Sequence, residues 1–316
     1  MMYRNTFKLI ISNFNLVWKI LLYLLFSSVC VLGLAYACSL PIINLLHEQG
    51  ILTMFVDLFK EFSHSFNVYE LLSGFVTLIE NFCTVIAVNI NRLWLYIVLF
   101  LFIVIIVRAF LNGFYRFATT HALYNSMSSN IKIGFTTSLF SCFGLNIRYQ
   151  LASLIVQLPL DILLFATLYY LVSWLITTEG LLLLAPIALI VGVMLLVGFK
   201  VTLFSGWIPA IITFDCGVWK GLKLGVKAVF RNFYRAYSTV ILIMLSLFVL
   251  NVVCALCTFG VSTIITLPLS LFTILVFNMV MFYSSHGMRF YVDSDNVVSP
   301  KRMEETDTIN SLKYII

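Results

Sequence analysis

The sequence predicts an all-α, polytopic integral membrane protein with six transmembrane helices, and composition and charge distribution carry that prediction. Hydrophobic residues make up 62% of the 316 residues, against about 45–50% in a soluble domain. Charged residues make up 10%, against about 25%, and the mean hydropathy is +1.06. So little charge cannot cover the surface of a soluble 36.0 kDa protein. The composition therefore excludes a soluble enzyme, a disordered chain and a disulfide-rich secreted domain.

Six stretches are long and apolar enough to cross a bilayer, which takes about 20 residues for a hydrocarbon core about 30 Å thick. The last two come from one uncharged stretch that is too long for a single span and is divided at Gly260. The predicted spans are 20–43, 93–111, 151–176, 181–205, 237–259 and 261–285.

The positions of Lys and Arg predict the orientation of these spans. Cytoplasmic loops of membrane proteins carry an excess of both residues. If the N-terminus is cytoplasmic, only Lys60 and Arg92 of the 19 basic residues lie on the outer side. We therefore expect a multi-pass protein of a cell membrane, most simply a bacterial one, with both termini cytoplasmic. Residues 1–288 are expected to form one transmembrane domain, and residues 289–316 a polar cytoplasmic tail.

The long segment 47–92 is expected to lie outside the cell as two amphipathic helices, because its polar and apolar residues alternate with a helical period. Asp57, Glu61 and His64 share one helical face. These side chains have the chemistry of metal ligands, but a lone cluster of this type is more often a solvated polar face. We expect no metal site.

The chain also suggests a threefold internal repeat. The repeated unit would be an elbow, meaning a short amphipathic helix on the inner face, followed by a helical hairpin. An offset of 87 residues aligns Phe143 with Phe230, and an offset of 219 aligns Asn13 with Asn232. Parallel repeats are common in transporters, but they also occur in proteins that transport nothing.

The third elbow combines a cationic face with an opposite apolar face that includes Val218, Val229 and Phe233. Such a helix is expected to lie in the interface, with its apolar side among the acyl chains. The face is either a topological anchor without lipid selectivity or a specific site for anionic lipid or a protein partner. Its cations are Lys220, Lys223, Lys227, Arg231 and Arg235.

Three ionisable residues interrupt the predicted spans, namely Asp161, Arg108 and Lys200. Charges inside a bilayer are costly and commonly functional. Arg108 and Lys200 are near span ends and can extend to the interface, whereas Asp161 cannot. We expect Asp161 to form a structural ion pair with Arg108 or Lys200. The alternative is a role in proton or substrate coupling.

Known catalytic and nucleotide-binding motifs are missing from the sequence: it has no P-loop, H-E-x-x-H, G-x-S-x-G or Gly-rich dinucleotide fingerprint. Cys254 and Cys257 have the spacing of a redox pair, but no basic residue beside them would activate a thiolate. We expect them to serve helix packing. The prediction is a protein without enzymatic activity and without a cofactor.

The region around Gly217, Lys220 and the Arg231-Asn232-Phe233 tripeptide resembles a loose group of bacterial multispan membrane proteins. That group includes the membrane domain attached to some glycerophosphodiesterases. The resemblance implies a membrane domain only: the chain has no room for a soluble phosphodiesterase barrel, so no catalytic residues carry over.

The expected function is that of a lipid-interacting or permease-like membrane component. Its expected partners are anionic headgroups at the inner leaflet and another membrane protein, but no nucleic acid. An accessory or scaffold subunit of a membrane complex is the alternative, and a membrane-embedded enzyme comes third. A water-accessible cavity at Asp161 would favour transport, whereas a closed bundle around a paired Asp161 would favour a scaffold.

Overall fold

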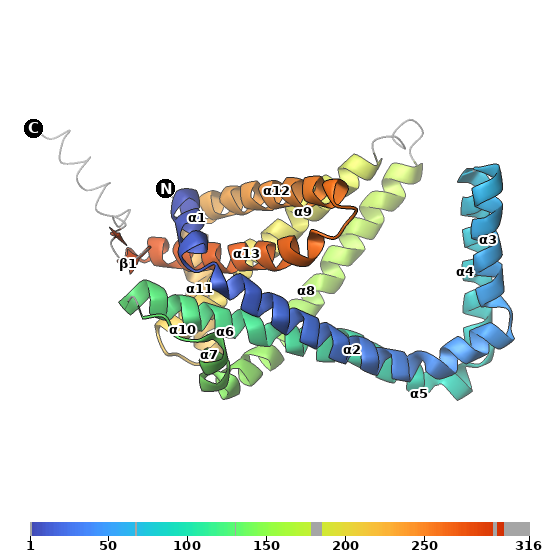
Figure 1. Cartoon of the computed structure of the whole chain (residues 1–316), viewed down its shortest axis with the longest axis horizontal. Helices are drawn as coiled ribbons and strands as arrows, with labels where there is room; N and C mark the ends of the chain where they lie inside the picture. Colours follow the sequence, from blue (N-terminus) through green and yellow to red (C-terminus); the bar gives the residue numbers. More distant parts are fainter. Residues whose placement is uncertain (1, 67, 130, 178–184, 293–295, 300–316) are drawn as a thin grey trace, which may run out of the picture. The chain divides into compact units, whose positions relative to one another are not determined.

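The computed structural model describes residues 2–66, 68–129, 131–177, 185–292 and 296–299. Within these residues, six helices are long and apolar enough to cross a membrane, which confirms the predicted number of spans and the class of multi-pass membrane proteins. The chain divides into two compact units (Figure 1). The smaller unit is Phe26–Leu111, and the larger unit comprises the residues up to Leu25 and those from Asn112 onward.

The smaller unit contains most of helix α2 (Asn15–Glu48) and a hairpin of two helices, α3 (Ile51–Ser65) and α4 (Val68–Val88). Gly50 separates α2 from α3 in the left-handed conformation, with φ of 72°, which glycine adopts without steric cost. Asn89 separates α4 from the next apolar helix. The two amphipathic helices predicted between the first two spans are therefore present.

The second predicted span lies on a helix that is longer than the span itself. Helix α5 (Ile90–Leu101) continues through a π-helical segment, η1 (Phe102–Val107), into α6 (Arg108–Ser129). The helix continues past residue 111, the predicted end of the span, into a stretch where apolarity falls. Thr119 and Ser126 of α6 are buried against protein, so this part of the helix does not need lipid-compatible side chains.

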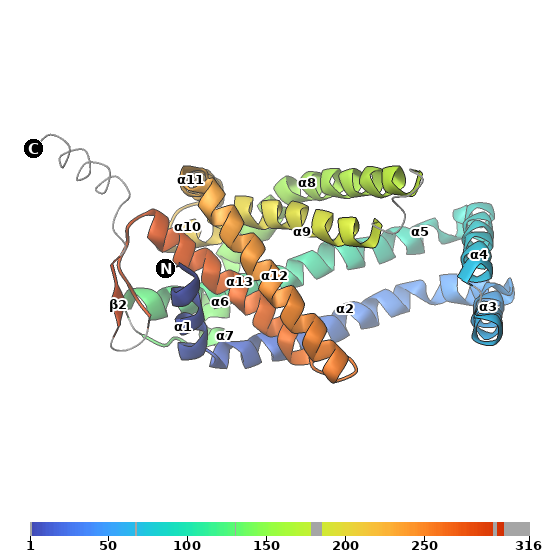
Figure 2. The same ribbon diagram turned by 90° about the horizontal axis from the view of Figure 1, so that it is seen from above.

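The larger unit is built around α13, which is 56% buried over its most apolar window, against 22% or less in the other five candidate spans. Helix α1 packs against α13 (Figure 1), α12 crosses it, and α8 and α9 run side by side (Figure 2). The remaining elements of this unit are α1 (Met2–Ser12), α7 (Phe135–Ser141), α8 (Phe143–Thr177), α9 (Ala185–Phe204), α10 (Trp207–Thr213), α11 (Val218–Arg231), α12 (Phe233–Cys257) and α13 (Thr263–Ser285).

The helices around the third and fourth predicted spans differ in detail from the sequence prediction. Helix α8 begins at Phe143, before residue 151, where the third span was predicted to start, and its polar Asn146 and Gln150 are buried and bonded to each other at 3.0 Å. Helix α9 ends at Phe204, one residue before the end predicted for the fourth span, and the short helix α10 that follows was not predicted. The start predicted for the fourth span, residue 181, lies outside the described residues.

The region predicted as a polar tail begins with a strand pair. Strand β1 (Phe290–Tyr291) runs antiparallel to β2 (Val297–Val298), with Phe290 opposite Val298. Phe290 and Val292 are buried in the core of the larger unit, and the Ser12 hydroxyl donates to the Val292 carbonyl at 3.0 Å. Residues 300–316, including Lys301, Arg302 and Lys313, lie outside the described part of the chain.

Helices α1, α7 and α11 each end at a break that leads at once into a long apolar helix. The offset that aligns Asn13 with Asn232 agrees with these breaks, since Asn13 lies in the break after α1 and Asn232 in the break after α11. The offset that aligns Phe143 with Phe230 does not agree, because α8 starts at Phe143 and α12 at Phe233. The discrepancy arises because α11 has 14 residues and α7 has 7.

Candidate functional site on helix α11

Helix α11 is held between two short breaks in the backbone. Gly217 precedes it in an extended conformation, with φ of −61° and ψ of 154°, and Asn232 follows it at φ of −136°. Arg231 lies in the last turn, where a cation interacts favourably with the negative end of the helix dipole. The predicted third elbow is therefore a separate helix in front of α12.

The exposed side of α11 carries cations together with aromatic side chains. Trp219 is 59% exposed and Phe230 is 60% exposed. At 100° per residue, both project along one edge of the cationic face, next to Lys223. Aromatic rings beside cations are typical of helices at the boundary between headgroups and acyl chains. All five predicted cations are exposed, namely Lys220, Lys223, Lys227, Arg231 and Arg235.

The buried side of α11 is lined mainly by small residues and packs against α10. A Cβ atom on Gly225 would lie 2.6 Å from the carbonyl oxygen of Gly206, which directly precedes α10. A Cβ atom on Gly221 would lie 2.4 Å from Cγ1 of Ile211. The backbones of α10 and α11 can approach this closely because Gly206 and Gly225 have no side chains. The cationic face is thus presented by a helix fixed to the protein.

One part of the sequence prediction for α11 was wrong. Val218 and Val229 were expected among the acyl chains, but both are buried in the protein, and Trp207 Nε1 donates to the Val218 carbonyl at 2.9 Å. The sequence prediction assigned the faces of the helix from its charged and hydrophobic side chains and did not consider the glycines. The spacing of Gly221 and Gly225, which is typical of closely packed helices, is the signal that identifies the buried side.

The turn between α10 and α11 encloses a thiol. Cys216 is buried and contacts the carbonyl oxygen of Ala210 at 3.6 Å. Burial raises the pKa of the Cys216 thiol, and the nearby Lys220 only partly offsets this effect. The thiol is therefore in its protonated, unreactive form near neutral pH.

Two of the three charged residues in the predicted spans form an ion pair. Lys200 of α9 donates to Oδ1 of Asp161 of α8 at 2.5 Å. Of the two partners considered from the sequence, Lys200 is the one that the structure pairs with Asp161. The Asp161 side chain is 53% exposed and that of Lys200 is 23% exposed. Arg108 is exposed at the start of α6 and forms no ion pair within the described residues.

Within the described residues, no group of three or more His, Cys, Asp or Glu side chains is placed to hold a metal ion. In place of such a site, Asp57 accepts a hydrogen bond from Lys60 at 3.2 Å, on the same helix.

No protein family matches the chain, and no curated protein or solved structure matches it. The resemblance to the membrane domain of bacterial glycerophosphodiesterases therefore stays a prediction from the residues around α11.

Proposed function

We propose that the protein is a non-enzymatic membrane component that binds anionic lipid headgroups through the exposed face of α11. The observation that carries this proposal is the exposure of all five cations on and next to a helix whose opposite side is packed into the protein. Clusters of four to eight Lys or Arg beside a membrane are typical of anionic-lipid sites, and each cation contributes about 1 kcal/mol.

Two further features support lipid binding over a purely topological anchor. Trp219 and Phe230 border the cations, so a bound lipid would meet phosphate-binding groups and apolar rings side by side. The glycine contacts with α10 fix the helix before any lipid arrives. A site that is already ordered loses less conformational entropy on binding.

The proposal also fixes the side of the membrane. An excess of Lys and Arg marks the cytoplasmic side, so α11 is proposed to lie at the inner leaflet, with both termini in the cytoplasm. The helices α1, α7 and α11 are proposed to be the elbows of a threefold repeat. Gly134 and Gly217, which precede α7 and α11 in nearly the same extended conformation, support this equivalence.

Lipid binding by the full-length protein tests the proposal. Native mass spectrometry would compare retention of phosphatidylglycerol and phosphatidylcholine by the wild type and by the double variant Lys223→Gln, Lys227→Gln. We expect the double variant to retain less phosphatidylglycerol. The matched control removes the same charge from other exposed positions, Lys60→Gln with Arg92→Gln, and should bind as the wild type does. Equal loss in both variants, or no loss in either, would refute a specific site.

A permease-like role is the second candidate, and the half-exposed pair of Asp161 and Lys200 favours it. A carboxylate in the middle of a span serves as a coupling site when a water-filled cavity reaches it, and the Asp161 carboxylate is not enclosed by protein. The scaffold alternative would instead need Asp161 to serve stability alone. The stability of an Asp161→Asn variant, treated in the Discussion, separates these two roles.

A further inference from the structure

The hairpin of α3 and α4 has two chemically distinct sides. Phe75 of α4 packs edge-on against Phe55 and Phe59 of α3, with ring centroids 6.4 and 5.9 Å apart. These rings therefore lie on one common side of the hairpin. Leu58 packs against Gly74 between the two helices.

The phenylalanine side remains largely uncovered. The exposed fraction is 44% for Phe59 and 55% for Ile79. At 100° per residue, Ile79 and Phe82 continue the side begun by Phe75. Contiguous apolar patches of this kind on soluble surfaces mark contacts with proteins or membranes. The exposed apolar residues on this side and its outer edges are Phe55, Val56, Phe59, Val76, Ile79 and Phe82.

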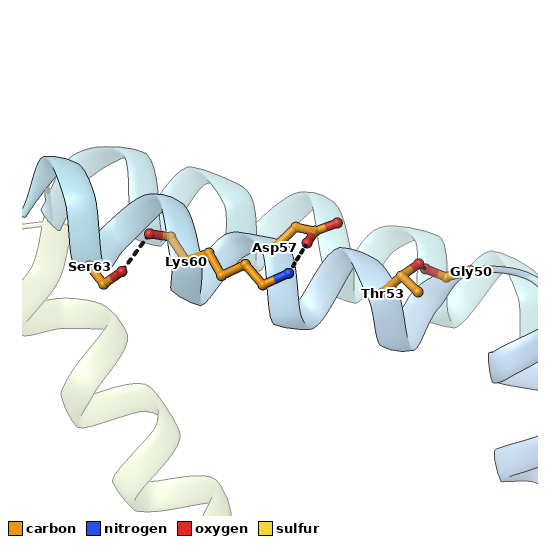
Figure 3. Close-up of polar contacts among 5 residues, drawn as sticks. All are labelled: Gly50, Thr53, Asp57, Lys60 and Ser63. Atoms are coloured by element: carbon orange, nitrogen blue, oxygen red, sulfur yellow. Dashed lines mark hydrogen bonds and ion pairs between the residues drawn. The ribbon is translucent and has the colours of Figure 1, made fainter.

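Exposed polar side chains of the hairpin include an ion pair and a hydrogen bond within α3. Lys60 donates to Asp57 at 3.2 Å, and Ser63 donates to the Lys60 carbonyl at 2.7 Å (Figure 3). Both side chains of the ion pair are more than 60% exposed, so they need no further partner than water. Glu61 and Glu80 are exposed on the side opposite the phenylalanines.

Both ends of the hairpin are joined directly to membrane spans. Helix α2 ends at Glu48 and α3 begins at Ile51, while α4 ends at Val88 and α5 begins at Ile90. The linkers are too short to carry the base of the hairpin away from the bilayer surface, since one extended residue spans at most about 3.6 Å. Lipid is therefore the apolar phase within reach of the exposed rings.

We propose that the α3–α4 hairpin lies flat on the membrane surface, with the phenylalanine side inserted at the boundary of headgroups and acyl chains. The acidic side then faces water. The hairpin carries the acids Asp57, Glu61, Glu70 and Glu80 against one lysine, so the contact is apolar and does not depend on anionic lipid. This surface is independent of the cationic site on α11.

Site-directed spin labelling of the full-length protein in phosphatidylcholine nanodiscs tests the proposal. In a background with the seven native cysteines changed to Ser, single labels would replace Phe59 and Ile79 on the phenylalanine side (Phe59→Cys, Ile79→Cys). The matched controls on the opposite side are Glu61→Cys and Glu80→Cys. We expect several-fold greater accessibility to oxygen relative to a nickel chelate at Phe59 and Ile79 than at the controls, at low and high salt alike.

Two outcomes would overturn the proposal. Equal access of the nickel chelate to both sides would mean that the hairpin stands in water. Exclusion of both oxygen and nickel from the phenylalanine side would mean that protein, such as a second copy of the chain, covers it. If the cysteine-free background does not fold, Phe59→Trp and Glu61→Trp give the same comparison, with quenching of the added tryptophan by brominated lipid taken as the difference from the wild type, which has five tryptophans. Because these discs contain no anionic lipid, the result does not depend on lipid binding by α11.

Discussion

Gly206 and Gly225 meet backbone to backbone: a Cβ atom on Gly206 would lie 2.7 Å from the Gly225 carbonyl oxygen. Backbone atoms on both sides of the contact cannot rotate away as the end of a side chain can. This contact couples α10 to α11 and thereby fixes the direction of the cationic face.

The first prediction concerns this contact. Gly225→Ala should destabilise the protein by about 1–3 kcal/mol, as extra methyl groups do in well-packed sites. Thermal unfolding in detergent measures the effect. Gly217→Ala is the matched control, because Gly217 has open space around its Cβ position and a φ of −61° that alanine adopts freely. A Gly225→Ala variant as stable as the control would show that the helices can separate without cost.

The second prediction concerns the pair of Asp161 and Lys200. Asp161→Asn leaves Lys200 without its carboxylate and should lower stability by about 1–3 kcal/mol, the cost of a partly buried polar group that loses its partner. The double variant Asp161→Asn, Lys200→Gln should recover part of the loss. Melting temperatures of the wild type and the two variants in detergent check this. Should Asp161→Asn melt at or above the wild type, the pair does not serve stability and transport becomes the leading function.

The third prediction concerns topology. Reporter fusions after Glu61 should be active outside the cytoplasm, and fusions after Lys132 and Lys223 inside it, because the basic residues are concentrated in the latter segments. An alkaline phosphatase and green fluorescent protein pair gives opposite signals at each site. A cytoplasmic signal after Glu61 would reverse the orientation and would move α11 to the outer leaflet.

The fourth prediction concerns the thiol of Cys216. Burial raises its pKa, so less thiolate is present at neutral pH, and maleimide should modify Cys216 much more slowly than the exposed Cys83. Its modification should increase with pH up to values above the ordinary range for a thiol, since the thiolate is the reactive form. Mass spectrometry of the intact protein and its peptides measures both sites. Equal rates at pH 7 would contradict the buried position.

The sequence predicted those features that depend on the apolarity of one segment. The six spans and the two helices between residues 47 and 92 follow from runs and periods of hydrophobic residues, and the pairing of Asp161 follows from the cost of an isolated charge. The continuation of α6 and the existence of α10 do not follow in this way. Thr119 is fully buried, so its environment is set by neighbouring helices and not by its own segment.

For the candidate site, the sequence predicted the exposed cationic side of α11, but the prediction for the opposite side of the helix was wrong. Exposed lysines repeat with the helical period and stand out in a hydrophobic chain. The partner of Gly225 is Gly206, which lies in a separate turn, and a single sequence does not reveal which glycine meets which. Strand β1 was missed for a similar reason, since the core in which Phe290 is buried includes residues far away in the chain.

The packing of α1 against α13, and the hydrogen bond from Ser12 to the Val292 carbonyl, bear on how the protein is made. The ribosome delivers α1 more than two hundred residues before α13, the helix against which α1 packs. Until then, Leu9 and Ile10 of α1 lack the α13 part of the core in which they are buried. The larger unit can therefore close only after the last span has entered the membrane. Insertion factors that shelter early helices should matter more for this protein than for one whose neighbouring helices pair in the order of synthesis.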